Sequence, residues 1–108
     1  MDEICDVTIT AEDAEWLAGW VRRLVEDRLA ACGNIVVGRV RSIYRWEGVV
    51  EDGEEVRVTL HTRRSLVPAI IERADADHPY DTPQVLAVPV VAAHPGYHRW
   101  VLDSTDPA

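Results

Sequence analysis

Residues 34–62 read NIVVGRVRSIYRWEGVVEDGEEVRVTLHT and alternate between apolar and polar side chains. This period of two is typical of β-strands, because successive side chains of a strand point to opposite faces. We therefore predict one strand over residues 34–46 and a return strand over residues 56–62. The dipeptide Asp52-Gly53 between them is a strong turn signal, and it predicts that the two strands form an antiparallel hairpin.

The first of these strands would be unusually long, since about five or six residues is typical. Gly38 within it and Gly48 just beyond it are natural places for a bulge or a bend. Apolar side chains occupy both of its faces: Val36, Val40, Tyr44 and Trp46 lie on one, and Ile35, Val37 and Ile43 lie on the other together with Arg39, Arg41 and Arg45. The three arginines could pair with Glu54 and Glu55 across the hairpin, and the apolar residues predict that both faces are partly buried.

The segment before the hairpin predicts a strand followed by a helix. Residues 4–10 alternate as a half-buried strand does. Thr10 followed by acidic residues is typical of a helix start, and we expect Thr10 to be the cap. Apolar residues then recur at helical spacing, at Leu17, Val21, Leu24 and Val25. Gly33 is the expected left-handed stop of this helix.

The segment after the hairpin predicts a helix, a strand and a final short helix. Ser65 can cap the second helix, with Pro68 tolerated in its first turn. The helix cannot continue past Pro79, because the residue before a proline is biased away from helical geometry. Residues 84–91 are apolar and predict the last strand, and Pro95 is expected to open the C-terminal helix.

The predicted order is therefore strand, helix, strand, strand, helix, strand and a short C-terminal helix, in a single domain spanning residues 1–108. This βαββαβ order is that of the α+β ferredoxin-like sandwich, in which an antiparallel sheet carries two helices on one face. Pro89 lacks a backbone N–H, which predicts that the last strand lies at an edge or that its pairing is broken there. The other sheet face stays bare in a single chain, which predicts contact with another subunit.

The charge balance excludes several classes of partner. The chain has 19 acidic residues against 11 basic ones, a net charge of -8, which argues against binding to nucleic acid or to anionic membranes. No apolar run is long enough to span a membrane, and the acidic start Met1-Asp2-Glu3 favours a cytoplasmic protein. Cys5 and Cys32 match neither a zinc nor a redox pattern, so we expect free thiols.

Three blocks of sequence, residues 30–35 (AACGNI), 42–48 (SIYRWEG) and 78–83 (HPYDTP), resemble the CutA family of divalent-cation tolerance proteins. Residues 24–29 (LVEDRL) and 97–101 (YHRWV) extend the resemblance nearly end to end. The resemblance implies a ferredoxin-like subunit in an interlocked homotrimer. It also implies binding of copper or other divalent ions and a part in metal tolerance.

His78 is the best single candidate metal ligand, with Asp77 and Asp81 as possible oxygen ligands or as groups that orient its ring. The Cys and second His found in some members of the resembled family are Ile9 and Asp77 here. The set therefore predicts a weak, oxygen-rich site, suited to Cu(II) or another divalent cation. The alternative is that His78 and Tyr80 satisfy backbone groups and pack on the sheet.

A second set of candidates belongs to an interface or a cleft. Tyr44, Trp46 and Glu47 on the hairpin can serve as interface anchors, or they can line a cleft between subunits together with His78 and Tyr80. Cys32, expected at the end of the first helix, is assigned to the same set and is interpreted as a small packing residue rather than a soft-metal ligand.

Other chemistry is not indicated. His94 is expected to cap the last helix, and His94 and His98 are interpreted as surface histidines. The sequence has no Ser-His-Asp set, phosphate-binding glycine loop or paired metal motif, so we do not expect an enzyme. Three function classes stay open: a metal-binding or tolerance protein, a trimeric small-ligand sensor resembling the PII-type regulators, and a structural trimer that presents partners.

Overall fold

The chain folds into five strands and three α-helices, which a computed structural model describes over residues 2–107. In chain order they are β1 (Ile4–Ala11), α1 (Ala14–Glu26), β2 (Cys32–Ile35), β3 (Val40–Trp46), β4 (Val49–Arg63), α2 (Val67–Asp77), β5 (Val85–Pro89) and α3 (Pro95–Ser104). A short 3-10 turn, Arg64–Leu66, precedes α2. None of the described helices is long and apolar enough to cross a membrane.

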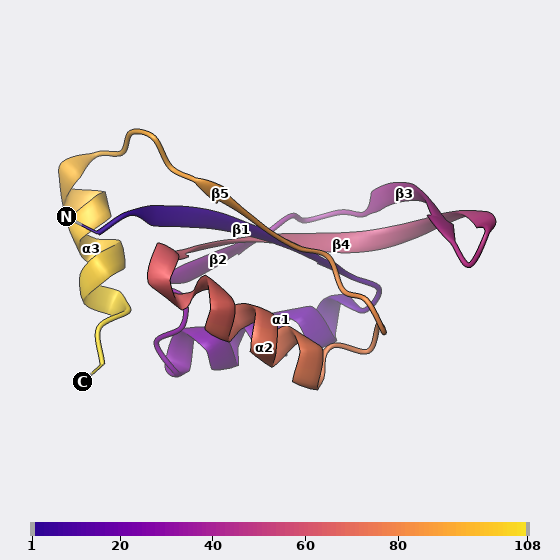
Figure 1. Cartoon of the computed structure of the whole chain (residues 1–108), viewed down its shortest axis with the longest axis horizontal. Coiled ribbons are helices and arrows are strands. Elements are labelled where there is room, and N and C mark those ends of the chain that lie inside the picture. The colour runs from indigo at the N-terminus through magenta and orange to yellow at the C-terminus, as the bar shows by residue number, and fades with distance from the viewer. Residues whose placement is uncertain (1, 108) are drawn as a thin grey trace.

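The strands form one antiparallel sheet in the order β2-β4-β1-β5, and β3 pairs with the outer part of β4. Helices α1 and α2 lie side by side against one face, and α3 packs at the end of the sheet away from the hairpin (Figure 1). The hairpin projects beyond the rest of the chain, whose principal extents are 44 × 26 × 24 Å. The predicted α+β, ferredoxin-like βαββαβ arrangement with a short C-terminal helix is confirmed.

The hairpin turn lies five residues earlier than predicted. Trp46 pairs with Val49, so the turn residues are Glu47 and Gly48, and both have positive φ, 49° and 81°. Positive φ at both central residues is the backbone of a type I′ turn, which matches the twist of the flanking strands. Asp52-Gly53 lies within β4 opposite Ile43 and Ser42, so the predicted turn there is wrong. Gly48, predicted as a place for a bulge or a bend, lies in the turn itself.

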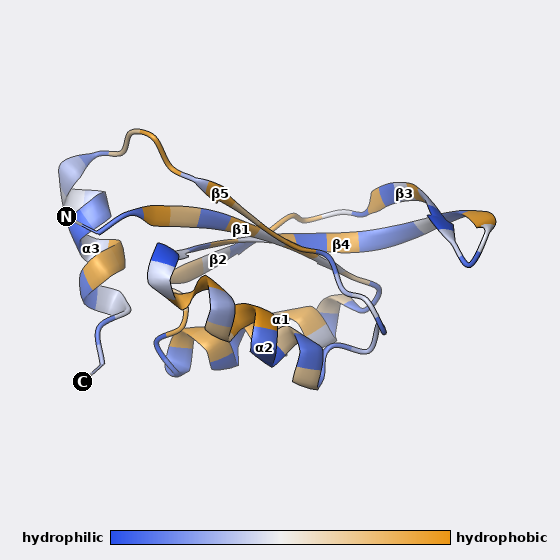
Figure 2. Cartoon of the chain, viewed as in Figure 1, coloured by the Kyte–Doolittle hydropathy of each residue, from blue (hydrophilic) through white to orange (hydrophobic). Residues whose placement is uncertain are grey.

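The single long strand predicted over residues 34–46 is divided into β2 and β3. Gly38 has a φ of 129° in the connection between them, which confirms the predicted bend. Both short strands pair with the 15-residue β4: β2 with its inner half and β3 with its outer half. One continuous strand thus carries the core of the subunit and the projecting hairpin (Figure 2).

The caps of the first two helices differ from prediction. Asp13, not Thr10, caps α1: its carboxylate accepts backbone N–H bonds from Glu15 and Trp16, while Thr10 belongs to β1. The left-handed residue after α1 is Arg28, with a φ of 60°, not Gly33. Ser65 provides no side-chain cap, because α2 continues from the 3-10 turn.

The core lies between the sheet and α1 and α2. Its fully buried members include Val7, Ile9, Leu17, Trp20, Leu24, Val58, Leu60 and Ile70. Gly33 lies in β2 and faces this core, and a Cβ built there would lie 2.5 Å from Cγ1 of Val21. The glycine therefore serves a close approach of strand and helix rather than a turn.

The C-terminal half follows prediction more closely. Pro68 lies in the first turn of α2, β5 is an edge strand that ends at Pro89, and Pro95 opens α3. His94 caps α3, since its Nδ1 accepts the backbone N–H bonds of Gly96 and Tyr97.

Candidate functional site

A cleft of about 870 Å³ lies between the hairpin and the loop that follows α2. Its walls include Glu12, Tyr44, Trp46, Tyr80 and Asp81. The type I′ turn fixes the register that places Tyr44 and Trp46 there, and the proline-bounded loop after α2 supplies Tyr80 and Asp81. The cleft brings together three of the predicted interface or cleft residues and one predicted metal ligand.

Tyr80 links the two sides of this cleft. Its hydroxyl donates a 2.9 Å hydrogen bond to Oε2 of Glu55 on β4, and its ring packs on that of His78 with centroids 4.6 Å apart. Burial, followed by the hydrogen bond to Glu55, raises the pKa of Tyr80 well above its ordinary value. The phenol therefore stays protonated and holds the loop against the hairpin.

The charge of the cleft is mainly acidic. Four carboxylates line it, those of Glu12, Glu54, Glu55 and Asp81, and Arg41 is the single basic residue among its described lining residues. The Arg41 guanidinium is bound bidentately by Asp52, at 2.9 and 2.7 Å, which lowers the pKa of that carboxyl. This leaves an excess of negative charge that favours cations over anions.

His78 lies beneath the cleft rather than in its described wall. Its ring is buried and both nitrogens have partners: Nε2 donates to the carbonyl of Thr10 at 2.9 Å, and Nδ1 accepts the backbone N–H of Tyr80 at 3.0 Å. A carbonyl can only accept and an N–H can only donate, so the two bonds define one neutral tautomer. A metal ion could reach either nitrogen only by replacing one of these bonds.

Asp77 also has structural partners. Its Oδ2 accepts the indole N–H of Trp20 at 3.0 Å and lies 3.5 Å from Nε of Arg73. Among residues 2–107, no three His, Cys, Asp or Glu side chains are grouped closely enough to hold a metal ion. The three predicted ligands thus lie near one another in the chain without converging on one point.

Two members of the predicted interface or cleft set lie elsewhere. Glu47 occupies the hairpin turn. Cys32 is at the start of β2, not at the end of a helix, and its Sγ lies 3.2 Å from Nδ1 of His61. Cys5 and Cys32 are both free thiols, as predicted.

The arginines of the hairpin pair only partly as expected. Arg39 approaches Glu54 at 3.3 Å, whereas Arg41 binds Asp52 and Arg45 donates to the carbonyl of Gly48. Sequence reasoning considered Glu55 only as an arginine partner and missed its bond to Tyr80. Glu55 and Tyr80 are 25 residues apart in the sequence, so no local pattern predicts their contact. The register of the hairpin brings them together.

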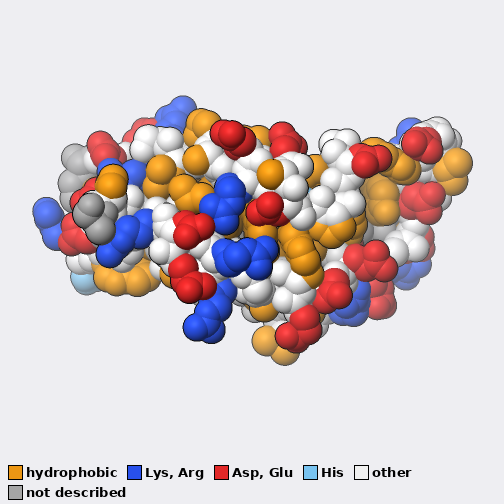
Figure 3. Space-filling view, turned by 90° about the horizontal axis from the view of Figure 1, so that it is seen from below, with side chains coloured by type: hydrophobic (Ala, Val, Ile, Leu, Met, Phe, Trp, Pro, Cys, Tyr) orange, Lys and Arg blue, Asp and Glu red, His pale blue; other side chains and the backbone are white. Residues whose placement is uncertain are grey.

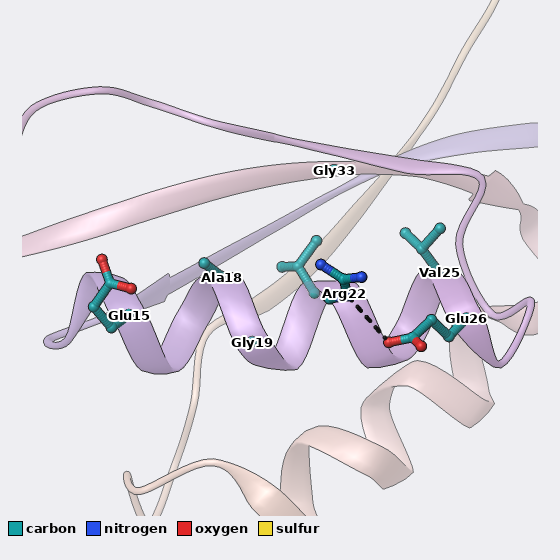
Figure 4. Close-up of a pocket in the computed structure, with 8 residues that line it drawn as sticks. Glu15, Ala18, Gly19, Arg22, Val25, Glu26 and Gly33 are labelled. Atoms are coloured by element: carbon teal, nitrogen blue, oxygen red, sulfur yellow. Dashed lines mark ion pairs between the residues drawn. The ribbon is translucent and has the colours of Figure 1, made fainter.

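A second hollow, of about 670 Å³, runs along α1 beside Gly33 of β2 (Figure 4). Its wall includes the exposed ion pair of Arg22 and Glu26, whose atoms are 3.6 Å apart. Such an exposed pair contributes little to stability or to binding. The cleft beside the hairpin is therefore the better candidate site.

Comparison with known proteins identifies the family. Residues 5–104 match the model of the CutA1 divalent ion tolerance protein. The divalent-cation tolerance protein CutA of Thermus thermophilus is 38% identical over 106 residues, which cover 97% of this chain and 99% of that protein. Protein CutA of Mus musculus is 42% identical over 85 residues, and the match covers 48% of its length.

Solved structures agree over nearly the whole chain. CutA1 from Oryza sativa superposes with a TM-score of 0.92 at 34% identity, covering 99% of this chain and 97% of that one. The Thermus thermophilus protein superposes with a TM-score of 0.88 at 38% identity, covering 98% and 100%. The chain spans about half the length of some relatives, such as the mouse protein, and all of others. With the fold and the sequence in agreement, the chain belongs to the CutA1 divalent ion tolerance family.

Proposed function

We propose that this chain acts in divalent-cation tolerance as a cytoplasmic homotrimer that binds Cu(II) or another divalent cation and has no enzymatic activity. The observation that carries the proposal is the acidic cleft between the hairpin and the loop after α2, in a chain of this family. Carboxylates attract divalent cations, and the aromatic side chains give the cleft a rigid wall. The free thiols of Cys5 and Cys32 fit a reducing compartment.

The proposed cation site lies where the cleft meets the loop, at Asp81, with His78 and Asp77 behind it. His78 would exchange its bond to Thr10 or to Tyr80 for the metal, at a cost that makes the site weak. One imidazole with carboxylate oxygens suits Cu(II) better than Cu(I), which prefers thiolates. Metal competes with protons for the imidazole, so affinity should fall in acid.

The test is a calorimetric titration of the metal-free protein with Cu(II). His78→Ala should abolish the tightest binding event, whereas the double variant His94→Ala/His98→Ala should leave it intact. Because His78 is buried, Asp81→Asn serves as a second variant at an exposed position and should weaken the same event. If both His78→Ala and Asp81→Asn titrate like wild type, the site assignment is wrong.

The homotrimer is supported by apolar side chains left exposed on the single chain. On the hairpin these are Ile43, Tyr44, Trp46, Val49 and Val50, and on the edge strand they are Leu86 and Val88. Viewed from the helix side, charged side chains are interspersed over the helices, and apolar ones are visible along the face, including the hairpin end (Figure 3). Patches of this kind mark contacts with other subunits.

Light scattering tests the assembly directly, since a trimer would have three times the 12.1 kDa mass of the chain. The Tm should also rise with protein concentration, because assembly stabilises the folded subunit by mass action. A monomer mass at micromolar concentration would overturn the trimer. In a parallel titration, heat from adenine nucleotides but not from Cu(II) or Zn(II) would favour a PII-like sensor instead.

A further inference from the structure

Three polar side chains form a row across the sheet at the end opposite the hairpin tip. His61 of β4 is the direct register partner of Cys32 on β2 and of Asp6 on β1. Directly paired residues of adjacent strands point to the same face. The neighbouring positions Leu60 and Val7 are buried in the core, so the row lies on the sheet face opposite α1 and α2.

The three side chains are close enough to act together. Sγ of Cys32 lies 3.2 Å from Nδ1 of His61, and Nε2 of the same ring lies 3.5 Å from Oδ1 of Asp6. The hydroxyl of Tyr97 on α3 approaches both Nδ1 of His61, at 2.7 Å, and Sγ of Cys32, at 3.4 Å. A thiol, an imidazole and a phenol from three elements thus meet at one point.

We propose that Sγ of Cys32 and Nδ1 of His61 together bind a thiophilic divalent cation of the Zn(II) or Cd(II) type. This site is separate from the acidic cleft and does not depend on the function proposed there. With zinc bonds of about 2.3 Å to sulfur and about 2.0 Å to nitrogen, the two ligand atoms lie about 3.0 Å apart at a bond angle of 90° and about 3.5 Å apart at the tetrahedral angle. The observed 3.2 Å lies within this range. The metal would replace the 2.7 Å contact between the Tyr97 hydroxyl and Nδ1 of His61.

Asp6 and Tyr97 complete the site as supporting groups. A carboxylate facing the far nitrogen of a metal-bound histidine holds the ring in the tautomer that leaves the near nitrogen free. Oδ1 of Asp6 lies 3.5 Å from Nε2 of His61, so Asp6 is the carboxylate nearest to that place and would have to move closer to form this hydrogen bond. The hydroxyl of Tyr97 lies 3.4 Å from Sγ of Cys32, so it can donate a hydrogen bond to the metal-bound sulfur.

Binding at this site releases one proton. The S–H bond of Cys32 breaks, the sulfur keeps the electron pair and forms the bond to the metal, and the proton passes to solvent. His61 binds through its existing lone pair, and solvent water fills the remaining positions. Cys5 is the comparison thiol that should not bind the metal. It is buried on the core side of the sheet, and burial raises the pKa of its thiol.

The experiment titrates the reduced, metal-free, full-length protein with Cd(II) and follows the ultraviolet charge-transfer absorption of the thiolate–cadmium bond. One ion per chain should bind with this absorption. Cys32→Ser should abolish it, and His61→Gln should weaken binding at least tenfold. Asp6→Asn should weaken binding about tenfold while the absorption per bound ion stays the same, as expected of a positioning residue.

The controls are Cys5→Ser, which keeps Cys32, and Asp81→Asn, which alters only the acidic cleft. Both should give the wild-type absorption, and far-ultraviolet circular dichroism should show that each variant is folded. The proposal is overturned if Cys32→Ser keeps the absorption, if Cys5→Ser loses it, or if His61→Gln binds Cd(II) as tightly as wild type. Failure of Cu(II) binding in the cleft would leave all of these results unchanged.

Discussion

The indole N–H of Trp20 donates a 3.0 Å hydrogen bond to Oδ2 of Asp77, which joins the centre of α1 to the last residue of α2. Trp20 is fully buried, so its N–H has no access to solvent and depends on this acceptor. The bond fixes the two helices relative to each other directly beneath the loop that carries His78 and Tyr80. Asp77 therefore has a structural role that is independent of any metal.

Asp77→Ala should lower the free energy of unfolding by about 1 to 3 kcal/mol, because it leaves a buried donor without a partner. Asp77→Asn keeps an amide oxygen as acceptor and loses only the partly exposed ion pair with Arg73, so it should cost less than about 1 kcal/mol. Urea unfolding at one protein concentration measures both. Asp75→Ala, at an exposed carboxylate of the same helix, is the control, and equal losses for all three variants would contradict the prediction.

The order of the elements was predictable because hydrophobic periodicity is a local property of the sequence. The position of the hairpin turn was not, since both Glu47-Gly48 and Asp52-Gly53 can form one. The choice is made by tertiary pairing: a turn at residues 52–53 would place Cys32 opposite a residue of α2. Only the turn at residues 47–48 allows β2 to pair with the buried half of β4.

The candidate site was predictable in its residues but not in their roles. Tyr44, Trp46 and Tyr80 were expected either as interface anchors or in a cleft between subunits. In the single chain they line one cleft, and His78 lies outside its described wall. That Thr10 and the backbone of Tyr80 would occupy both nitrogens of His78 could not be foreseen, because the contact with Thr10 spans 68 residues. The cluster of Cys32, His61 and Tyr97 was not predictable for the same reason, because its contacts span 29 and 36 residues and Cys32 lies on a strand instead of the expected helix end.

Gly33→Ala should destabilise the subunit, because the new methyl group would meet Cγ1 of Val21 at 2.5 Å. Overpacking of this kind typically costs about 1 to 3 kcal/mol. Val21→Ala removes the clashing methyl groups, so the double variant Gly33→Ala/Val21→Ala should lose clearly less than the sum of the two single losses. A double-mutant cycle by urea unfolding measures this coupling, and strictly additive losses would show that the strand shifts to avoid the contact.

Trp46→Ala should weaken the association of the proposed trimer more than it lowers the stability of the subunit. Truncating an aromatic anchor buried in an interface typically costs about 2 kcal/mol or more of binding free energy. Light scattering over a dilution series would show dissociation at higher protein concentration than for wild type. Trp100→Ala is a matched control on α3, because the two tryptophans are similarly exposed in the single chain, at 42% and 44%. A Trp46→Ala protein as resistant to dilution as wild type would place Trp46 outside the contact.

Alkaline pH should destabilise the protein through Tyr97 and Tyr80. Burial raises the pKa of Tyr97 to about 12 and also raises the pKa of Tyr80. A tyrosine in the unfolded chain has a pKa of about 10. Above that value the unfolded chain releases protons that the folded chain retains, so the free energy of unfolding must fall as pH rises.

Urea unfolding at a series of pH values up to about 11 would measure the slope of the unfolding free energy against pH. This slope corresponds to at most one proton released on unfolding for each tyrosine. Tyr97→Phe removes a titrating group, so its slope should be shallower than that of wild type, and Tyr80→Phe should act likewise. Tyr44→Phe is the control, because it removes the same hydroxyl group from a tyrosine that is half exposed. Its slope should match that of wild type. A wild-type slope that survives in both Tyr97→Phe and Tyr80→Phe would show that other groups, such as the buried thiol of Cys5, cause the alkaline loss.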